Sequence, residues 1–212
     1  MEATTQRPIL QISKTASTSL PISVADAKRH LHIEQIETYY DADLEAYINA
    51  AREYIEDFTN LTLFNTTITA KWNRFPSSPM EPLRLPAWPV SSVTSMAYRD
   101  VDGDAVTITV ASGVQTSLAS VPAYILPLPE TEWPETQVDR VDAVTVVFVA
   151  GYGTTDATVP HRIKQAAKLL VGHWFKNREA VLTGTISKEI ELAVHSLLNQ
   201  IRVNEFTEFE RQ

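Results

Sequence analysis

The spacing of hydrophobic positions changes twice along this chain, and each change marks a change of predicted structure. Between Asp41 and Asn60 the apolar residues recur every three or four positions, which is the spacing of one helix face. From Phe64 to Trp72 apolar and polar residues alternate and many are β-branched, which is typical of a strand. Helical spacing returns from Pro160 to Asn177. The pattern therefore predicts helix, then strand, then helix.

Shorter elements flank these three. Ser23, with Asp26 three residues later, forms an N-cap pattern and predicts a short helix that ends near His32. The pair Asp102-Gly103 suits a tight hairpin between two strands. A last helix is predicted over Glu189–Val203. The strands expected besides the first are Val93–Tyr98, Ala105–Val110 and Val144–Val149.

The prolines separate the β-rich part of the chain from the helical parts. Nine of the twelve prolines fall between Phe75 and Glu135. Because proline cannot donate to a central sheet ladder, we interpret these proline-rich segments as strand edges or links. We expect an α+β fold, an α-helical bundle with an inserted small antiparallel β subdomain. The predicted parts are an N-terminal extension (1–20), a helical body (21–60 and 154–203), the β-rich insert (61–153) and a C-terminal tail (204–212).

Composition narrows the class of protein. The 212 residues are 44% hydrophobic and 21% charged, which is typical of a soluble globular protein. The absence of cysteine excludes disulfides, thiolate metal sites and a cysteine nucleophile. The formal net charge of -8 disfavours sequence-specific DNA binding. The longest apolar run, Ala143–Ala150, is far shorter than the ~20 residues that span a bilayer, so we expect neither a membrane segment nor a targeting segment.

Each sequence motif that could indicate catalysis or ligand binding lacks one or more of its required residues. Gly151-Tyr152-Gly153 follows a strand as a dinucleotide-binding loop would, but the third glycine position holds Asp156. The alternating aspartates that start at Asp100 lack the acidic residue that closes a calcium loop. The histidines lack zinc-site spacing, and neither a serine-hydrolase elbow nor a phosphate loop occurs. We expect no catalysis, cofactor or metal; a small hydrolase or nucleotide-binding protein that uses the Gly151–Gly153 loop is the alternative.

Several segments in a fixed order carry a family likeness. The first segment is a short helix that opens with Pro-Ile-Ser-Val-Ala-Asp-Ala, and a proline-rich segment that leads into a strand follows it. After these come a glycine-containing loop that precedes a proline, and a helix whose last turn is aromatic. These segments resemble the head-tail connector (adaptor) family of long-tailed bacteriophages and gene transfer agents. One departure is that the loop before the last helix, Ile186–Ile190, lacks the proline expected in the family. The matching segments are Pro21–Leu31, Ala50–Glu56, Leu85–Ser95, Phe148–Gly153 with Val159-Pro160, His173–Val181 and Leu197–Val203.

The resemblance implies a place and a role. It implies a homo-oligomeric, twelve-fold ring beneath the portal protein, in the virion neck between capsid and tail, from subunits made in the host cytoplasm. Such a ring extends the DNA channel without binding DNA sequence-specifically, and it meets the downstream neck or tail protein. The resemblance also implies that the subunit has no cofactor and no catalysis. Another ring protein of the phage neck or tail is a second alternative.

Charge along the two long helices predicts how such a ring closes. The stretch Asp41–Asp57 holds six acids and one base, whereas Pro160–Arg178 holds five bases and no acid. In a head-to-tail ring two different surfaces meet, so an acidic helix and a basic helix would orient neighbouring subunits. Pairing of the two helices within one bundle, or plain solvation of both, is the alternative. The predicted inter-subunit residues are Asp43, Glu45, Glu53, Arg162, Lys164, Lys168, Trp174 and Arg178.

Two further surfaces are predicted near the C-terminal end. The apolar stripe Leu169–Phe175 is wider than one helix face needs, so we expect a neighbouring subunit to cover it. A core position for Trp174 and a helix-end position for Arg178 are the competing interpretation. The tail carries two phenylalanines among glutamates and is predicted to dock on the portal, with a loose terminus as the alternative. The predicted portal-binding residues are Leu198, Arg202, Phe206 and Phe209.

Overall fold

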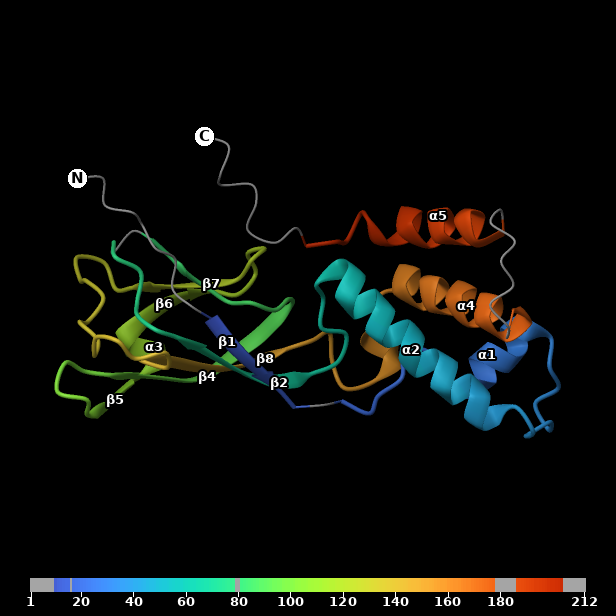
Figure 1. Ribbon diagram of the computed structural model, residues 1–212, viewed down its shortest axis with the longest axis horizontal. Coiled ribbons are helices and arrows are strands. Elements are labelled where there is room, and N and C mark those ends of the chain that lie inside the picture. The colour runs from blue at the N-terminus through green and yellow to red at the C-terminus, as the bar shows by residue number, and fades with distance from the viewer. Residues whose placement is uncertain (1–9, 16, 79–80, 178–185, 204–212) are drawn as a thin grey trace. The chain divides into compact units, whose positions relative to one another are not determined.

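The computed structural model describes residues 10–15, 17–78, 81–177 and 186–203. The chain divides into two units (Figure 1). The sheet unit holds Asn65–Gly151 together with the chain before Thr18. The helical unit holds Thr18–Phe64 and the chain from Tyr152 onward. Each unit is described by itself below.

A five-stranded sheet forms the larger layer of the sheet unit. Its order is β1-β2-β8-β4-β5, and all neighbours are antiparallel. Alternation along β2 buries every second side chain, and Ile68 lies opposite the buried Phe148 of β8. The period-two pattern in the sequence therefore corresponds to one buried face of this sheet. The strands are β1 (Leu10–Lys14), β2 (Thr66–Trp72), β4 (Val90–Arg99), β5 (Ala105–Ile108) and β8 (Val144–Ala150).

A second sheet comes from the proline-rich segments. Its order is β3-β7-β6, with β3 (Leu83–Arg84), β6 (Val114–Ser117) and β7 (Tyr124–Pro127). The interpretation of these segments as edges or links is wrong for β7, which is the central strand of this sheet. Its proline stands at the last strand position, where the Pro127 carbonyl still accepts a hydrogen bond from Gln115 Nε2 at 2.8 Å. A proline at the end of a strand removes no donor that the ladder needs.

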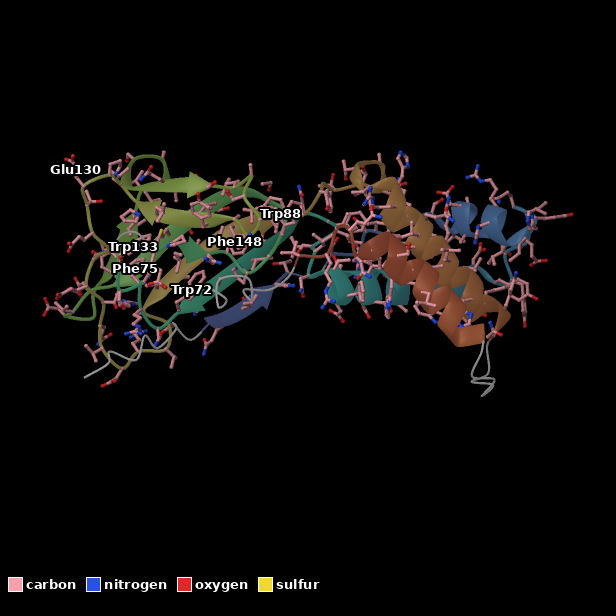
Figure 2. All side chains as sticks on the ribbon, turned by 90° about the horizontal axis from the view of Figure 1, so that it is seen from above. Trp72, Phe75, Trp88, Glu130, Trp133 and Phe148 are labelled. Carbon is pink, nitrogen blue, oxygen red and sulfur yellow. The ribbon has the colours of Figure 1, made fainter. Side chains whose placement is uncertain are left out.

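Side chains from both sheets form one hydrophobic core. Figure 2 shows Trp72 and Phe148 among the strands of the sheet unit, with Phe75 and Trp133 close together. The Phe75 ring stacks on Trp133 at 4.7 Å between centroids and meets Tyr98 edge-on at 5.7 Å. Trp133 lies in the long connection before β8, so this aromatic stack holds an otherwise irregular segment on the core.

The helical unit is a small bundle. Its elements are α1 (Val24–Leu31), α2 (Asp41–Thr59), a 3₁₀ turn η1 (Asp156–Thr158), α4 (His161–Lys176) and α5 (Ile186–Leu198). Helix α4 packs against α1, α2 and α5. The apolar positions predicted for α2 are its buried residues, among them Leu44, Ile48 and Ile55. Three helices of its own chain thus cover part of the wide apolar stripe of α4, while Leu169, Trp174 and Phe175 stay half-buried, and their cover by a neighbouring subunit stays a prediction.

The predicted α+β fold class is confirmed, with differences at several elements. The strand predicted over Ala105–Val110 ends at Ile108, because the short helix α3 (Val110–Gly113) follows at once. Helix α5 begins at Ile186 and ends at Leu198, earlier than predicted at both ends. Strand β1 was not predicted; it pairs with β2 along its whole length, although its side chains from Gln11 to Lys14 are exposed.

Candidate functional site

The acidic residues of α2 divide into inward and outward groups. Asp41 forms an ion pair with the buried Lys28 at 2.5 Å. Glu56 accepts a hydrogen bond from the Leu63 backbone N–H at 2.7 Å. These two carboxylates therefore stabilise the helical unit itself. The three acids predicted at a subunit interface are exposed, and they are Asp43, Glu45 and Glu53.

The bases of α4 are arranged differently from the prediction. Arg162 donates to Gln200 Oε1 at 3.0 Å, and Lys164 pairs with Asp156 at 3.3 Å. Both predicted interface bases thus have partners within their own unit. Lys168 has a different environment, because it lies with Lys176 near His30 of α1. The sequence did not indicate this grouping, since Asp156 precedes the helix and His30 is far away along the chain.

A cluster of positive groups therefore joins α1 and α4. Burial lowers the pKa of His30 below its usual value, and the nearby charges of Lys168, Lys176 and His32 lower it further. Helix α4 itself has no acidic residue in its first turn, and His173 and Lys176 stand in its last turn. We name His30, His32, Lys168 and Lys176 the basic cluster. Its two lysines, Lys168 and Lys176, carry positive charge that the carboxylates of a partner can bind.

Trp174 belongs to an aromatic contact within the helical unit. Its ring lies 6.5 Å from that of Tyr47 on α2, and the next residue, Phe175, meets Tyr40 edge-on at 5.3 Å. Trp174 is half-buried. These contacts favour the core interpretation of Trp174, and its role between subunits stays a prediction. Arg178 lies outside the described residues.

The predicted portal-binding residues have unlike environments. Leu198 is fully buried, so its side chain stabilises the unit's own core. Arg202 is exposed and holds its guanidinium 5.1 Å from the centre of the Phe58 ring. Phe206 and Phe209 lie outside the described residues. Portal binding by the end of the chain therefore stays a prediction. Leu198 supports that end of the chain from the core, because its side chain is buried.

Contacts between α2 and the end of the described chain form a group that sequence reasoning missed. Tyr54 Oη lies 3.0 Å from His195 Nε2, and the His195 ring stacks on Phe58 at 4.4 Å. The Val203 N–H donates to the Thr59 carbonyl at 2.9 Å. Asn60, in the left-handed region with φ 57°, donates its side-chain amide to the Val203 carbonyl at 3.0 Å. We call these contacts the α2–α5 clasp. Its one signal in the sequence was Asn60, a residue type that commonly ends a helix in the left-handed conformation.

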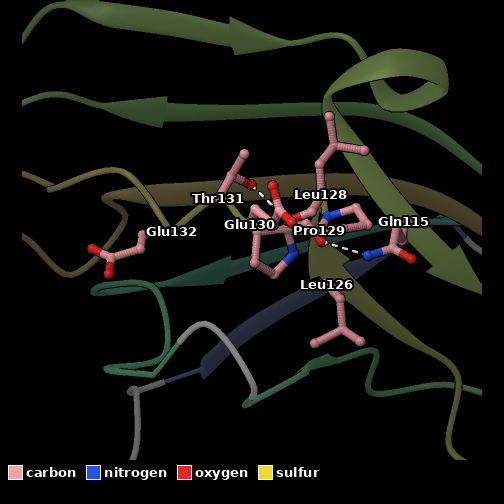
Figure 3. Close-up of a pocket in the computed structure, with 8 residues that line it drawn as sticks. Gln115, Leu126, Leu128, Pro129, Glu130, Thr131 and Glu132 are labelled. Atoms are coloured by element: carbon pink, nitrogen blue, oxygen red, sulfur yellow. Dashed lines mark hydrogen bonds between the residues drawn. The ribbon is translucent and has the colours of Figure 1, made fainter.

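The hollows of the sheet unit do not resemble a catalytic site. One groove of about 480 Å³ is lined by Gln115 and residues 126–132. Figure 3 shows these residues around the turn after β7. Two polar groups there bond to backbone carbonyls: Gln115 to Pro127, and Thr131 Oγ1 to Leu128 at 2.8 Å. These hydrogen bonds shape the turn after β7. Among the described residues, no group of three or more His, Asp or Glu side chains has the arrangement to hold a metal ion.

The two loops weighed as ligand sites have structural explanations. Asp100 Oδ1 accepts hydrogen bonds from the backbone N–H groups of Asp102 and Asp104 at 3.1 and 2.9 Å, so it holds the β4–β5 turn. Gly153 has φ 154°, and a Cβ there would lie 2.5 Å from Thr158 Oγ1. Glycine is therefore required by close packing against η1. Within the described residues, no helix is long and apolar enough to cross a membrane.

Solved structures share this fold. A chain from the neck of an empty gene transfer agent particle, computed with C6 symmetry, is 22% identical with a TM-score of 0.73. A chain from the virion of a native gene transfer agent particle is 20% identical with a TM-score of 0.72. A chain from the native neck, computed with C12 symmetry, is 21% identical with a TM-score of 0.67. Each comparison covers 93% of this chain and 98% of the other.

Sequence comparison gives the family directly. No curated protein matches the chain significantly. The family described as head completion protein matches residues 21–189, a span that includes α1 and α2, all of the strands after β1, and α4. The resemblance noted from the sequence, to proteins that join phage heads to tails, is confirmed by this match. The chain belongs to the head completion protein family.

Proposed function

We propose that this chain is a structural, non-enzymatic head-tail connector subunit. It forms a homo-oligomeric ring in the neck of a phage-like particle, between the portal protein and the next neck or tail protein. The observation that carries the proposal is the family match over residues 21–189. The shared fold with neck chains of particles computed with C6 and C12 symmetry supports a ring.

The surfaces of the helical unit supply a physical basis for ring closure. One subunit presents the exposed acids Asp43, Glu45 and Glu53, and its neighbour presents the basic cluster. Because the two surfaces differ, contacts between them favour head-to-tail order over pairing of like surfaces. The net charge of -8 gives DNA phosphates little to bind, so DNA passes through the channel without adhering.

The portal complex tests this function. The purified chain is mixed with the portal protein of the same particle, and native mass spectrometry measures the copies bound per portal ring. We expect twelve, matching the C12 symmetry of the related neck. A portal ring that binds none of the chain would refute the connector role.

The same protein tests the competing nucleotide-binding hypothesis. A ligand that binds the native state raises the melting temperature, so ATP, NAD and Mg²⁺ are each added in a thermal unfolding experiment. We expect no shift with any of them. A shift that a Gly153→Ala variant loses would favour a nucleotide site at the Gly151–Gly153 loop.

A further inference from the structure

The connection between α1 and α2 exposes two large apolar side chains. We name Ile33–Tyr40 the apex loop. In it Ile36 is 86% exposed and Tyr39 is 79% exposed. The half-buried Tyr40 meets Phe175 edge-on, and the Tyr39 ring rests edge-on against Tyr40 at 4.9 Å between centroids while staying largely exposed. Single exposed apolar residues are ordinary, but two large ones three residues apart on a short loop form a potential pair of anchors.

A buried lysine fixes this loop to α1. The Lys28 side chain is 5% exposed, and its ammonium binds Asp41 at 2.5 Å and the Gln35 carbonyl at 3.3 Å. Gln35 returns a contact, because its side-chain amide donates to the Ala25 carbonyl at 3.2 Å. The middle and the end of the loop are therefore both held by α1.

Turns within the loop add to this order. The Glu37 N–H donates to the Glu34 carbonyl at 3.1 Å, and the Asp41 N–H donates to the Thr38 carbonyl at 3.1 Å. The Glu37 carboxylate accepts from the Tyr39 N–H at 2.8 Å. A loop that is already ordered loses less conformational entropy when a partner binds it. The exposed anchors thus stand on a preorganised support.

The charge around the anchors indicates the chemistry of the partner. The stretch from Ile33 to Ala51 holds five acids and no Lys, Arg or His. One of them, Asp41, is neutralised by Lys28. The exposed carboxylates call for a partner surface with an apolar pocket and a rim of lysine and arginine, since charges at a contact are complementary. The exposed acids of the loop itself are Glu34 and Glu37.

The apex loop lies at one end of the helical unit, opposite the last described residues of the chain. It precedes the first residue of α2, whereas Val203 bonds to Thr59 at the last residue of that helix (Figure 1). A helix of this length spans roughly 28 Å. The two ends of the unit therefore present different surfaces at a distance that allows two partners.

A second copy of this chain fits the loop poorly. The bases that would complement the acidic loop are those of the basic cluster, and His30 and Lys176 lie at the same end of the unit as the loop. In the proposed ring that cluster already faces Asp43, Glu45 and Glu53 on the α2 of a neighbouring subunit. It is therefore not left to complement Glu34 and Glu37 of the loop.

We propose that the apex loop is the docking site for the next neck protein, which receives Ile36 and Tyr39 in an apolar pocket rimmed by lysine and arginine. The inference rests on the proposed connector function, and it assigns the portal to the opposite end of the helical unit.

A full-length double variant tests the docking site. Ile36→Ser with Tyr39→Ser is compared with wild type for binding to the purified portal ring and to the purified downstream neck protein of the same particle. We expect the affinity for the downstream protein to fall at least about 20-fold, because buried anchors carry most of the energy of a contact. Portal affinity should stay within about twofold, the size of effect expected away from a contact.

Matched variants separate the loop from general effects. Val138→Ser with Val141→Ser has the same spacing at exposed sites of the sheet unit, 81% and 52% exposed, and should leave downstream binding unchanged. Deleting residues 204–212 should weaken portal binding only. Lys28→Met keeps both anchors but frees the loop; downstream binding should fall while hydrogen exchange rises at residues 33–39. Gln35→Ala gives the same comparison with less disturbance of α1.

The outcomes distinguish this inference from the function on which it rests. Unchanged downstream binding in the double variant overturns the docking site, as does a loss of portal binding or of ring formation. If wild type binds the portal but not the downstream protein, the connector role stands and the docking site is wrong. If wild type binds neither, both are wrong. A wild-type chain that instead forms dimers dependent on Ile36 and Tyr39 also overturns the docking site, since the occupant is then a second copy.

Discussion

His30 reports on the basic cluster because its pKa is lowered by burial and by the other members of the group. It lies against α4 at Gly172, where a Cβ would approach His30 Nε2 to 3.3 Å. Burial lowers its pKa first, and the ammonium groups of Lys168 and Lys176 lower it further. The folded chain thus resists protonation of His30 more than the unfolded chain does. As the pH falls through about 6.5, the ordinary histidine value, this residue's contribution to stability is lost.

Lys168→Gln should raise the pKa of His30 toward its ordinary value, because one of the two nearby lysine charges is removed while burial remains. Two-dimensional NMR titration of the histidine side chains measures this directly. The stability of the variant should also fall less steeply below about pH 6.5 than that of wild type. Lys71→Gln, in the sheet unit, is the control and should leave the His30 titration unchanged. A His30 pKa that does not rise would mean that the charge of Lys168 does not lower it.

Helices and strands were predicted as far as their local pattern carries the information. Ser23 caps α1 as expected, by accepting the Asp26 N–H at 3.0 Å, whereas Asp41, expected to cap α2, is its first helical residue and Tyr40 holds the cap position. Strand β1 left no such trace, because its exposed side chains show no buried face and its place comes from backbone pairing with β2. Strand β7 was missed because its proline argued against a central strand. Pro127 is the last residue of β7, where a proline is tolerated.

The candidate site was predicted less completely, since it depends on contacts between distant segments. The acids predicted at the interface, Asp43, Glu45 and Glu53, are exposed on α2. The sequence did not indicate that Asp156 pairs with Lys164, or that Leu198 is buried. The apex loop was not predicted at all, because Ile36 and Tyr39 lie in a connection without periodicity. Their significance depends on Lys28, which is held by contacts that only the folded chain reveals.

Two conservative substitutions test whether the α2–α5 clasp holds the last described residues of the chain on α2. Tyr54→Phe removes the hydroxyl next to His195, and Asn60→Gly keeps the left-handed conformation while removing the bond to Val203. Each lost hydrogen bond should cost about 1 kcal/mol, or a fall of roughly 2–4 °C in melting temperature. Hydrogen exchange should rise at residues 195–203. The control is Tyr124→Phe in β7, and equal exchange in wild type and both variants would contradict the clasp.

At the scale of the whole molecule, charge should govern the order of subunits in a ring. Lys168→Glu with Lys176→Glu should reduce ring formation on the portal, because the basic cluster then repels the acids of the neighbouring α2. Adding Glu45→Lys and Glu53→Lys should restore part of the yield, since the reversed charges attract again. Lys164 is left unchanged because it pairs with Asp156. Ring yield is measured by negative-stain microscopy across a range of salt concentrations.

The control for this exchange is Lys14→Glu with Lys71→Glu, which makes the same change of net charge within the sheet unit. It should leave ring yield and its salt dependence as they are in wild type. If the basic-cluster variant behaves like this control, charge pairing does not order the ring, and exposed ion pairs contribute as little here as they commonly do.

The division of the chain into two units also sets an order of events during synthesis. The helical unit is built from two separated segments, so α2 leaves the ribosome more than a hundred residues before the end of its partner α4. At ~5–20 residues per second that delay is roughly 5 to 20 s. Once Gly151 has been made the sheet unit has all its strands, whereas Leu44, Ile48 and Ile55 still lack α4. The apolar face of α2 is therefore the part of the nascent chain that a cellular chaperone would bind.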